Sequence, residues 1–205
     1  FNPNIKPSNR GAIALKGNSK KLKLKAELPF YALSFPVPSL STIDNEKTAY
    51  TLEMLAYVLD NGLSKSLIRN QQIASSIGVG YRLYDKYDTL FTLSFIPASG
   101  VSNDTVLKAI KTQVAELINN PNFIQGELSR TKAQLEADFV FEQDQISTQS
   151  YYLGMLSTVG LGVDKMFTYV DKMNEIKAED VSKAAKQYLD FSISNSVELI
   201  PQGVK

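Results

Sequence analysis

The sequence predicts an α+β fold, in which helices cover a mixed or antiparallel β-sheet. Two observations support this class. Segments with a period of two come in pairs, at residues 21–35 and 73–95, and segments with helical spacing dominate from residue 107 onward. Strands grouped in hairpins and separated from runs of helices are typical of α+β proteins, so helices packed on one sheet are expected.

The first nineteen residues differ from the rest of the chain. Residues 1–19 carry prolines and glycines among polar residues, which is typical of a linker or extended N-terminal segment. A short strand is expected within them at Ala12–Lys16. The folded domain is therefore expected to span residues 20–203.

Two strands are predicted between Lys20 and Pro38. In the first, lysines alternate with Leu22 and Leu24, so the lysines lie on one face of the strand and the leucines on the other. The second covers Phe30–Phe35. The lysines favour a solvated strand face, although a basic binding patch remains an alternative.

A helix of about four turns is predicted after Asp44. Its apolar side recurs at Ala49, Leu52, Ala56 and Leu59, and Asn61-Gly62 provides a stop signal. A shorter helical segment at Ser64–Asn70 follows. Residues 73–81 and 91–95 then alternate as two strands joined by a turn at residues 84–88, so they predict a β-hairpin.

The second half of the chain is predicted to be mainly helical. The pattern closes with a strand at Ser194–Ile200. The expected helices cover Leu107–Leu117, a segment from Leu128 through Phe139, Gln145–Leu161, Val163–Ile176 and Ala178–Leu189.

Composition excludes several classes of function. The 205 residues contain no histidine and no cysteine, the side chains that most often hold a catalytic transition metal or serve as nucleophiles. The 22 basic and 21 acidic residues leave a net charge of +1, which disfavours nucleic-acid binding. No apolar stretch is long enough to span a bilayer.

Gly78 and Gly80 lie inside a predicted strand, without a third glycine at the spacing of a phosphate-binding loop. Close packing is the favoured explanation. A small-residue face that includes Ala74 and Ser76 is an alternative, because an extended peptide could approach it.

Five segments in order resemble the insulinase or pitrilysin-type zinc metallopeptidases, specifically the C-terminal, non-zinc half of their repeat. The resemblance covers most of residues 20–203. The segments are LPFYALSFPVPS at 28–39, LEMLAYVLDNGLSKSLIRNQQIASSIGVGY at 52–81, DTLFTLSFIPASGVSNDTVLKAI at 88–110, NPNFIQGELSRTKAQLEADFVF at 120–141 and IKAEDVSKAAKQYL at 176–189.

The resemblance implies a fold of two related units, each a mixed or antiparallel sheet covered by helices, similar to the mitochondrial processing peptidase. In that family the zinc-bearing half carries a His-x-x-Glu-His helix, which this histidine-free chain cannot supply. The resemblance thus implies no cofactor in this chain and a zinc ion in a partner half. Whether that half is fused or separate is left open by the sequence.

The family's non-zinc half often contributes an arginine and, seven positions later, a tyrosine near the scissile carbonyl. In this sequence Ile68 and Ser75 stand at those positions, and Arg69 is displaced by one residue. The resemblance therefore suggests substrate binding by Arg69 with Tyr81 or Tyr84. The alternative is that Arg69 interacts at the helix end and the tyrosines pack.

The function implied is a non-catalytic half that forms the substrate chamber with a zinc-bearing half and takes part in peptide cleavage. Such a chain should be inactive alone. Two alternatives remain: an inactive structural subunit, and a peptide-binding domain without any peptidase partner. The family's commoner bacterial setting is the periplasm, which is the location expected.

Overall fold

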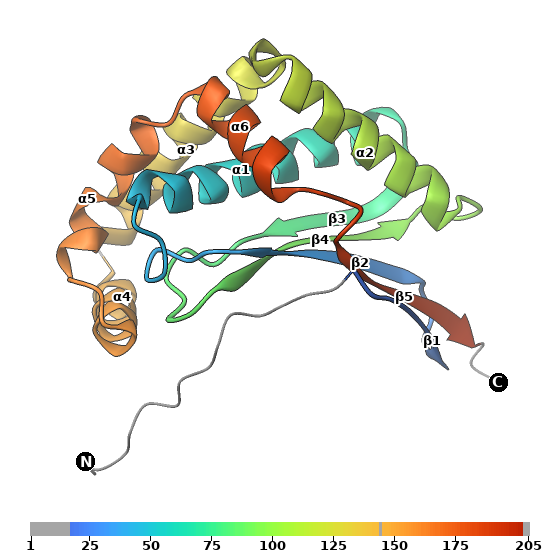
Figure 1. Cartoon of the computed structure of the whole chain (residues 1–205), viewed down its shortest axis with the longest axis horizontal. Helices are drawn as coiled ribbons and strands as arrows, with labels where there is room; N and C mark the ends of the chain where they lie inside the picture. Colours follow the sequence, from blue (N-terminus) through green and yellow to red (C-terminus); the bar gives the residue numbers. More distant parts are fainter. Residues whose placement is uncertain (1–16, 144, 203–205) are drawn as a thin grey trace, which may run out of the picture.

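The computed structural model describes residues 17–143 and 145–202 (Figure 1). The strand expected at Ala12–Lys16 lies outside the described residues. Ser19 already belongs to the first strand, so the expected boundary between linker and domain falls close to the start of the sheet.

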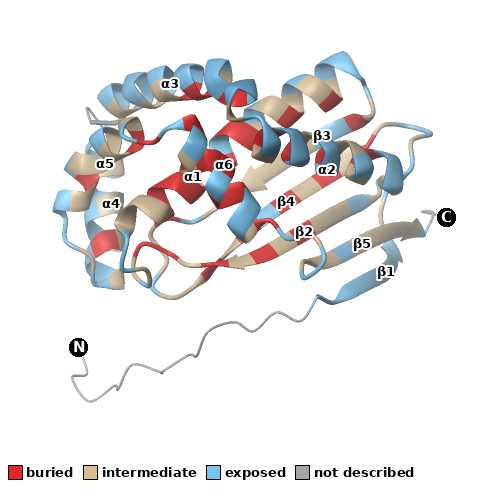
Figure 2. Cartoon of the chain, turned by 45° about the horizontal axis from the view of Figure 1, so that its top comes forward, coloured by how far each residue is buried: buried red, intermediate tan, exposed pale blue. Residues whose placement is uncertain are grey.

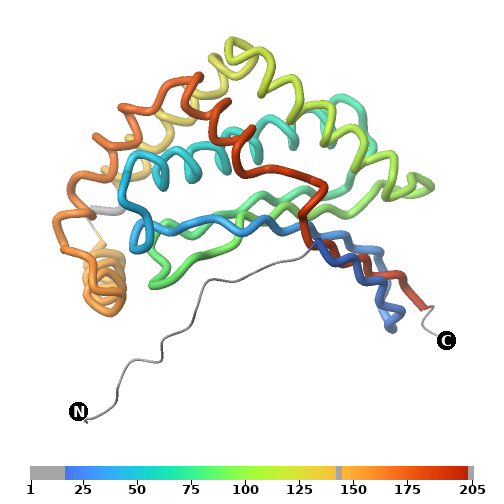
Figure 3. Tube along the Cα trace, in the orientation of Figure 1, coloured from blue at the N-terminus to red at the C-terminus, as the bar shows by residue number. Residues whose placement is uncertain are grey.

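Five strands form one mixed sheet in the order β1-β5-β2-β4-β3. The pairs β5–β2, β2–β4 and β4–β3 are antiparallel, whereas β1 and β5 are parallel. The trace in Figure 3 brings β1 and β5 together from nearly opposite ends of the described chain. The strands are β1 (Ser19–Lys25), β2 (Phe30–Val37), β3 (Ala74–Gly80), β4 (Thr89–Pro97) and β5 (Asn195–Gln202).

The helical layer lies mostly on one face of this sheet, and one of its helices, α4 (Ile146–Val159), lies beside one end of the sheet (Figure 1). Its elements are α1 (Glu46–Leu63), the π-helix η1 (Ser64–Asn70), α2 (Asn103–Asn119), the 3₁₀ helix η2 (Pro121–Ile124), α3 (Gln125–Gln143), α4 (Ile146–Val159), α5 (Asp164–Asn174) and α6 (Ala178–Tyr188). Helix α1 begins where the Asn45 side chain accepts a hydrogen bond from the Lys47 backbone N–H, and it continues directly into η1.

Period-two alternation places the core between the sheet and α1. Leu33 and Phe35 of β2 and Phe91 and Leu93 of β4 are buried, whereas Ser34 and Thr92, which lie between them on the opposite face, are small and polar. Figure 2 shows the buried residues concentrated along α1, α6 and the adjoining strands. The strands therefore present one apolar face, and the helices cover that face.

The predicted fold class is confirmed: this is an α+β protein with a mixed sheet covered by helices. The described residues form one sheet with its helices, so they contain one of the two related units that the resemblance implied. The predicted β3–β4 hairpin is also confirmed. Ser64–Asn70 is helical as predicted, but it is a π-helical continuation of α1 rather than a separate helix.

The lysines of β1 lie on an edge strand and are exposed, in agreement with a solvated strand face. Lys21 pairs with Glu198 of β5, with 2.9 Å between Nζ and Oε2. Gly78 and Gly80 of β3 serve close packing, since a Cβ there would lie 3.3 Å from the Ser94 hydroxyl and 3.2 Å from that of Thr92. The close neighbours are thus side chains of strand β4.

Candidate functional site

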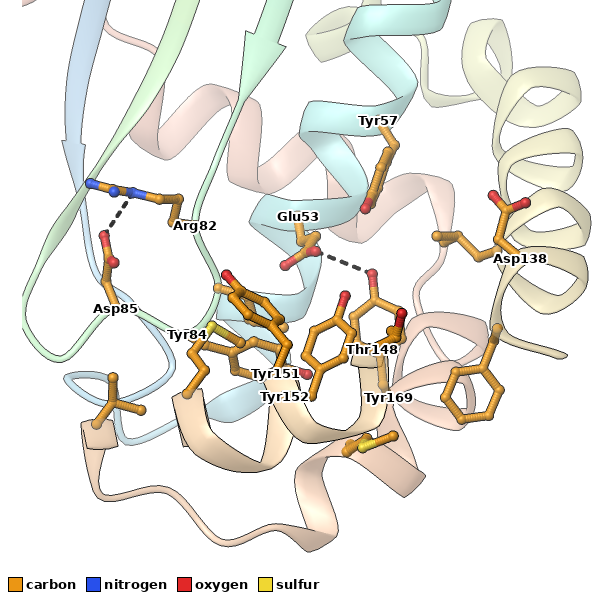
Figure 4. A pocket seen from close by; sticks show the side chains of 16 residues that line it. Glu53, Tyr57, Arg82, Tyr84, Asp85, Asp138, Thr148, Tyr151, Tyr152 and Tyr169 are labelled. Carbon is orange, nitrogen blue, oxygen red and sulfur yellow. Dashed lines mark hydrogen bonds and ion pairs between the residues drawn. The ribbon is translucent and has the colours of Figure 1, made fainter. Parts of the chain in front are cut away.

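A cavity of about 460 Å³ lies beside the middle of α1. It is enclosed by α1, the connection between β3 and β4, α3, α4 and α5 (Figure 4). Its wall combines apolar side chains with tyrosines from four of these elements. The tyrosines are Tyr57, Tyr84, Tyr151, Tyr152 and Tyr169.

Glu53 is the carboxylate at the centre of this cavity (Figure 4). It lies one helical turn after Ala49 and one turn before Ala56, so the geometry of α1 turns it toward the buried side of the helix. Leu52 and Met54, its neighbours in sequence, are fully buried. The helix therefore holds a charged group at the border of the apolar core.

The two oxygens of the Glu53 carboxylate differ in their contacts. The Tyr169 hydroxyl donates a hydrogen bond to Oε1 at 3.1 Å. Although part of the Glu53 side chain is accessible, Oε2 is buried and lacks a hydrogen-bond partner among the described residues. Burial disfavours the charged form and raises the pKa of Glu53 from 4.5 to about 7, against the opposing effect of the Tyr169 hydrogen bond.

The phenols around Glu53 stay protonated at neutral pH. Burial raises the pKa of Tyr84 and Tyr169 well above the ordinary value, and the nearby Glu53 charge acts in the same direction. The same two causes raise the pKa of Tyr81. Each of these three phenols thus remains a neutral hydrogen-bond donor, and Glu53 is the group that titrates near neutral pH.

The charged side chains near the cavity are mostly paired with one another. Arg82 Nε lies 3.1 Å from Oδ2 of Asp85, and Lys165 Nζ lies 2.6 Å from Oε1 of Glu46. Asp138 on α3 is exposed at the rim. None of the ion pairs found in the described part of the chain includes Glu53.

This arrangement can do two things chemically. A carboxyl group that titrates near neutral pH inside a cleft can exchange a proton with a bound molecule. In its ionised form it can also bind a positively charged group, because one of its oxygens has no other partner among the described residues.

Of the three residues predicted to bind substrate, only Tyr84 lines this cavity. Its ring meets that of Tyr152 edge to face, with 6.4 Å between centroids. Tyr81 is half-buried just after β3, and its hydroxyl donates a hydrogen bond to the Pro38 carbonyl oxygen at 2.8 Å. Arg69 is exposed on the last turn of η1.

The structure does not bring Arg69 together with the two tyrosines. Arg69 precedes β3 and the tyrosines follow it, and a strand of this length separates its ends by roughly 20 Å. A joint role of Arg69 and Tyr81 at one substrate atom is therefore disfavoured by geometry within this chain. Separate contacts with different parts of a substrate remain the prediction.

Sequence reasoning missed Glu53. A signal was present, because Glu53 shares the apolar stripe of its helix through its spacing from Ala49 and Ala56. A charged residue on such a stripe is rarely buried without a partner, so it marks a candidate site. The tyrosines that surround it come from distant segments and carry no comparable signal.

The residues of this chain do not fit a zinc ion. Structural and catalytic zinc sites use His, Cys, Asp and Glu side chains in sets of three or four, and the sequence contains no histidine or cysteine. In the described residues, no group of three or more such side chains is placed to hold a metal ion. No reaction step is therefore assigned to a metal bound by this chain.

The structure is thus an α+β domain in which helices cover a mixed sheet, and its described residues offer no set of metal ligands. The family comparison is more specific. Residues 2–135 match the peptidase M16 inactive domain, and the chain belongs to this family.

Similar solved structures share the fold. A protease from Helicobacter pylori superposes with a TM-score of 0.83 at 16% identity, over 98% of this chain and 49% of the protease. The inactive peptidase domain of a candidate zinc protease from Bordetella parapertussis gives 0.73 at 19% identity, over 90% of this chain and 96% of that one. The periplasmic protease PqqL from Escherichia coli gives 0.67 at 16% identity, over 92% and 21%.

These three proteins are bacterial, and at such low identity their similarity shows the fold alone. The chain spans about half of the Helicobacter protease but nearly all of the Bordetella domain. A comparison with curated proteins found no match. No helix in the described parts of the chain is long and apolar enough to cross a membrane.

Proposed function

We propose that this chain is the non-catalytic half of a zinc metallopeptidase, and that it encloses a substrate chamber together with a zinc-bearing half. The observation that carries this proposal is the match of residues 2–135 to the peptidase M16 inactive domain. The zinc-bearing half, fused or separate, would supply the metal and its attacking water. This chain would supply chamber wall and contacts with a peptide substrate.

The relative lengths of the similar proteins support a partner half. The Helicobacter protease is about twice as long as this chain, so a comparable amount of polypeptide lies outside the shared region. Apolar side chains on the outer helices also suit a surface that another domain covers. Among them, Phe141 is 71% exposed, Ile146 81% and Phe167 62%.

The test is reconstitution. The chain is mixed with the zinc-bearing half that precedes it in the same polypeptide or is encoded beside it, and hydrolysis of fluorogenic peptides is followed. We expect a rate well above that of either component alone. An unchanged rate, with both components folded, contradicts the chamber proposal.

Arg69→Ala tests the predicted substrate contact within the reconstituted enzyme. Loss of kcat with little change in KM would indicate contact in the transition state, whereas unchanged kcat/KM would identify Arg69 as surface structure. Lys65→Ala is the matched control, because Lys65 is an exposed cation about one turn earlier on η1.

A second candidate function is an inactive structural subunit. The separation of Arg69 from Tyr81 and Tyr84 favours it, because these three residues do not converge on one point. Failure of reconstitution would favour this candidate if the two chains still form a complex in size-exclusion chromatography.

A periplasmic location is also proposed, and the periplasmic Escherichia coli relative supports it.

A further inference from the structure

The cavity beside α1 has a chemical character that the proposed function does not explain. It contains a carboxylate whose Oε2 is buried and has no hydrogen-bond partner among the described residues. Removing an ionised carboxylate from water costs several kcal/mol unless a cation or several hydrogen bonds compensate. In the described residues the compensation is a single hydrogen bond from Tyr169.

The described cations near the cavity are engaged elsewhere. Arg82 pairs with Asp85, and Lys165 pairs with Glu46. The other titratable groups around Glu53 are acids or phenols: Tyr50 and Tyr57 on α1, Tyr81 and Tyr84 after β3, Asp138 on α3, Tyr151 and Tyr152 on α4, and Asp164 and Tyr169 on α5. The site therefore has an excess of negative potential once Glu53 ionises.

The walls of the cavity suit a cation that would pair with Glu53. The faces of tyrosine rings attract ammonium and guanidinium groups, and the attraction grows when water is excluded. Figure 4 shows Tyr57, Tyr84, Tyr152 and Tyr169 grouped around the Glu53 carboxylate. Apolar side chains, including Leu135, Met155 and Met166, complete the wall and suit an aliphatic stem.

Size and access are also suitable. A volume of about 460 Å³ lies within the range of small-molecule sites, roughly 300–1,000 Å³. Two residues of the wall reach the surface, since Tyr151 is 65% exposed and Tyr57 is 39% exposed. The cavity is therefore open to solvent on the side of these two tyrosines.

We propose that this tyrosine-lined cavity binds an organic cation, namely a primary ammonium or guanidinium group on an aliphatic stem, with Glu53 as the counter-ion. The group belongs either to a lysine or arginine side chain of a peptide or to a free small amine. The inference rests on this chain alone and does not require a zinc-bearing half.

The first test measures binding to the wild-type chain. Butylammonium and butylguanidinium are titrated at pH 8 and followed by chemical-shift changes in NMR spectra, with butanol as the neutral analogue. We expect the cations to bind at least ten times more tightly than butanol. Equal affinity of cation and alcohol, or no binding of the cations at millimolar concentration, overturns the proposal.

A second arm distinguishes the two sources of the cation. A capped tripeptide with lysine at its centre is compared with the same peptide containing norleucine, and with butylammonium. Tighter binding of the lysine peptide than of butylammonium identifies a peptide side chain, whereas tighter binding of butylammonium identifies a free amine. Equal binding of the lysine and norleucine peptides counts against a cationic peptide ligand.

Glu53→Gln tests the counter-ion directly. The amide has nearly the same size and can still accept the hydrogen bond from Tyr169, so the variant should fold. We expect its affinity for butylammonium to fall at least tenfold, while the affinity for butanol stays within threefold. Glu116→Gln, an exposed carboxylate on α2 outside this cavity, is the matched control. Equal cation affinity in Glu53→Gln and wild type overturns the proposal, and the titrations of the wild-type chain do not depend on this variant.

Because these measurements use no peptidase partner, their outcome is independent of reconstitution. Binding of the cation with no gain in hydrolysis would sustain the cavity proposal and refute the chamber proposal. A gain in hydrolysis without binding of the cation would support the chamber proposal and overturn the cavity proposal.

Discussion

The helices of this protein fall into two regions that use apolar residues differently. The central layer, defined as α1, α2 and α6, lies on the sheet and against its neighbours. The outer lobe is defined as residues 134–141 of α3 with α4 and α5. It lies beside the N-terminal end of α1 and away from most of the sheet (Figure 1). Ten residues of α1 are buried, but only Leu156 in α4.

The outer lobe is nevertheless not polar. Its exposed side chains include Val140, Phe141, Ile146, Tyr151 and Phe167, each more than 60% exposed. Folding of this chain alone does not require apolar residues at those positions, because they bury little surface. The central layer therefore contains most of the buried core, while the outer lobe contributes to the cavity wall and exposes apolar side chains.

The largest predicted effect follows directly from this difference. Leu55→Ala in the central layer should lower the free energy of unfolding by about 3 kcal/mol, because a fully buried leucine leaves a cavity when it is truncated. Leu153→Ala in the outer lobe, where the leucine is 38% exposed, should cost less than about 1 kcal/mol. Urea denaturation followed by circular dichroism measures both. Similar losses would show that the two regions contribute equally to stability.

The second prediction concerns Glu53, which lies at the contact between the two regions. Between pH 4.5 and about 7, the folded protein keeps the Glu53 proton and the unfolded chain releases it. The folded state then binds more protons, so stability falls as pH rises through this window and the cost stays constant above it. Glu53→Gln should remove this cost, so its stability relative to wild type should grow by about 2–3 kcal/mol over the window.

Denaturation at pH 4.5, 6, 7 and 8 measures that difference. The exposed carboxylate Glu116 again provides the control, since Glu116→Gln should change stability by less than about 0.5 kcal/mol at each pH. A constant difference between Glu53→Gln and wild type across the series would mean that Glu53 titrates in the folded protein as it does in the unfolded chain.

The same contrast explains what could be predicted from the sequence. In the central layer, local signals suffice: Ala49, Leu52, Ala56 and Leu59 mark α1, and the alternation around Phe91 marks β4. The parallel pairing of β1 with β5 could not be predicted, because it joins Ser19 to Ser196 and depends on the complete sheet.

The cavity shows the same limit. Glu53 carries a local signal through its place on an apolar stripe, but Tyr84, Tyr152 and Tyr169 come from separate elements that only tertiary packing brings together. The family resemblance directed attention to Arg69, Tyr81 and Tyr84, of which only Tyr84 lines the cavity. A family resemblance indicates which sequence positions correspond. It does not predict the environment of a side chain, because that environment depends on residues outside the motif.

The smallest predicted effect concerns backbone conformation at two left-handed positions, one in the outer lobe and one between η1 and β3. The outer lobe has Gly160 at its left-handed position after α4, with φ of 85°, and glycine adopts this conformation without strain. Gln72, between η1 and β3, has φ of 54°, which costs about 1 kcal/mol for a residue with a Cβ. The connection between η1 and β3 therefore contains a local strain that the outer lobe avoids at Gly160.

Gln72→Gly should consequently stabilise the protein by about 0.5 kcal/mol, since relief of the left-handed strain exceeds the added freedom of the unfolded chain. Gln71→Gly is the matched control: Gln71 has an ordinary φ of −85° and its amide donates to the Ser66 hydroxyl at 3.1 Å, so this change should be destabilising. Gly160→Ala should also destabilise, by about 1 kcal/mol. If Gln72→Gly lowers the thermal midpoint, side-chain contacts of Gln72 outweigh its backbone strain, and the two left-handed positions differ in more than residue type.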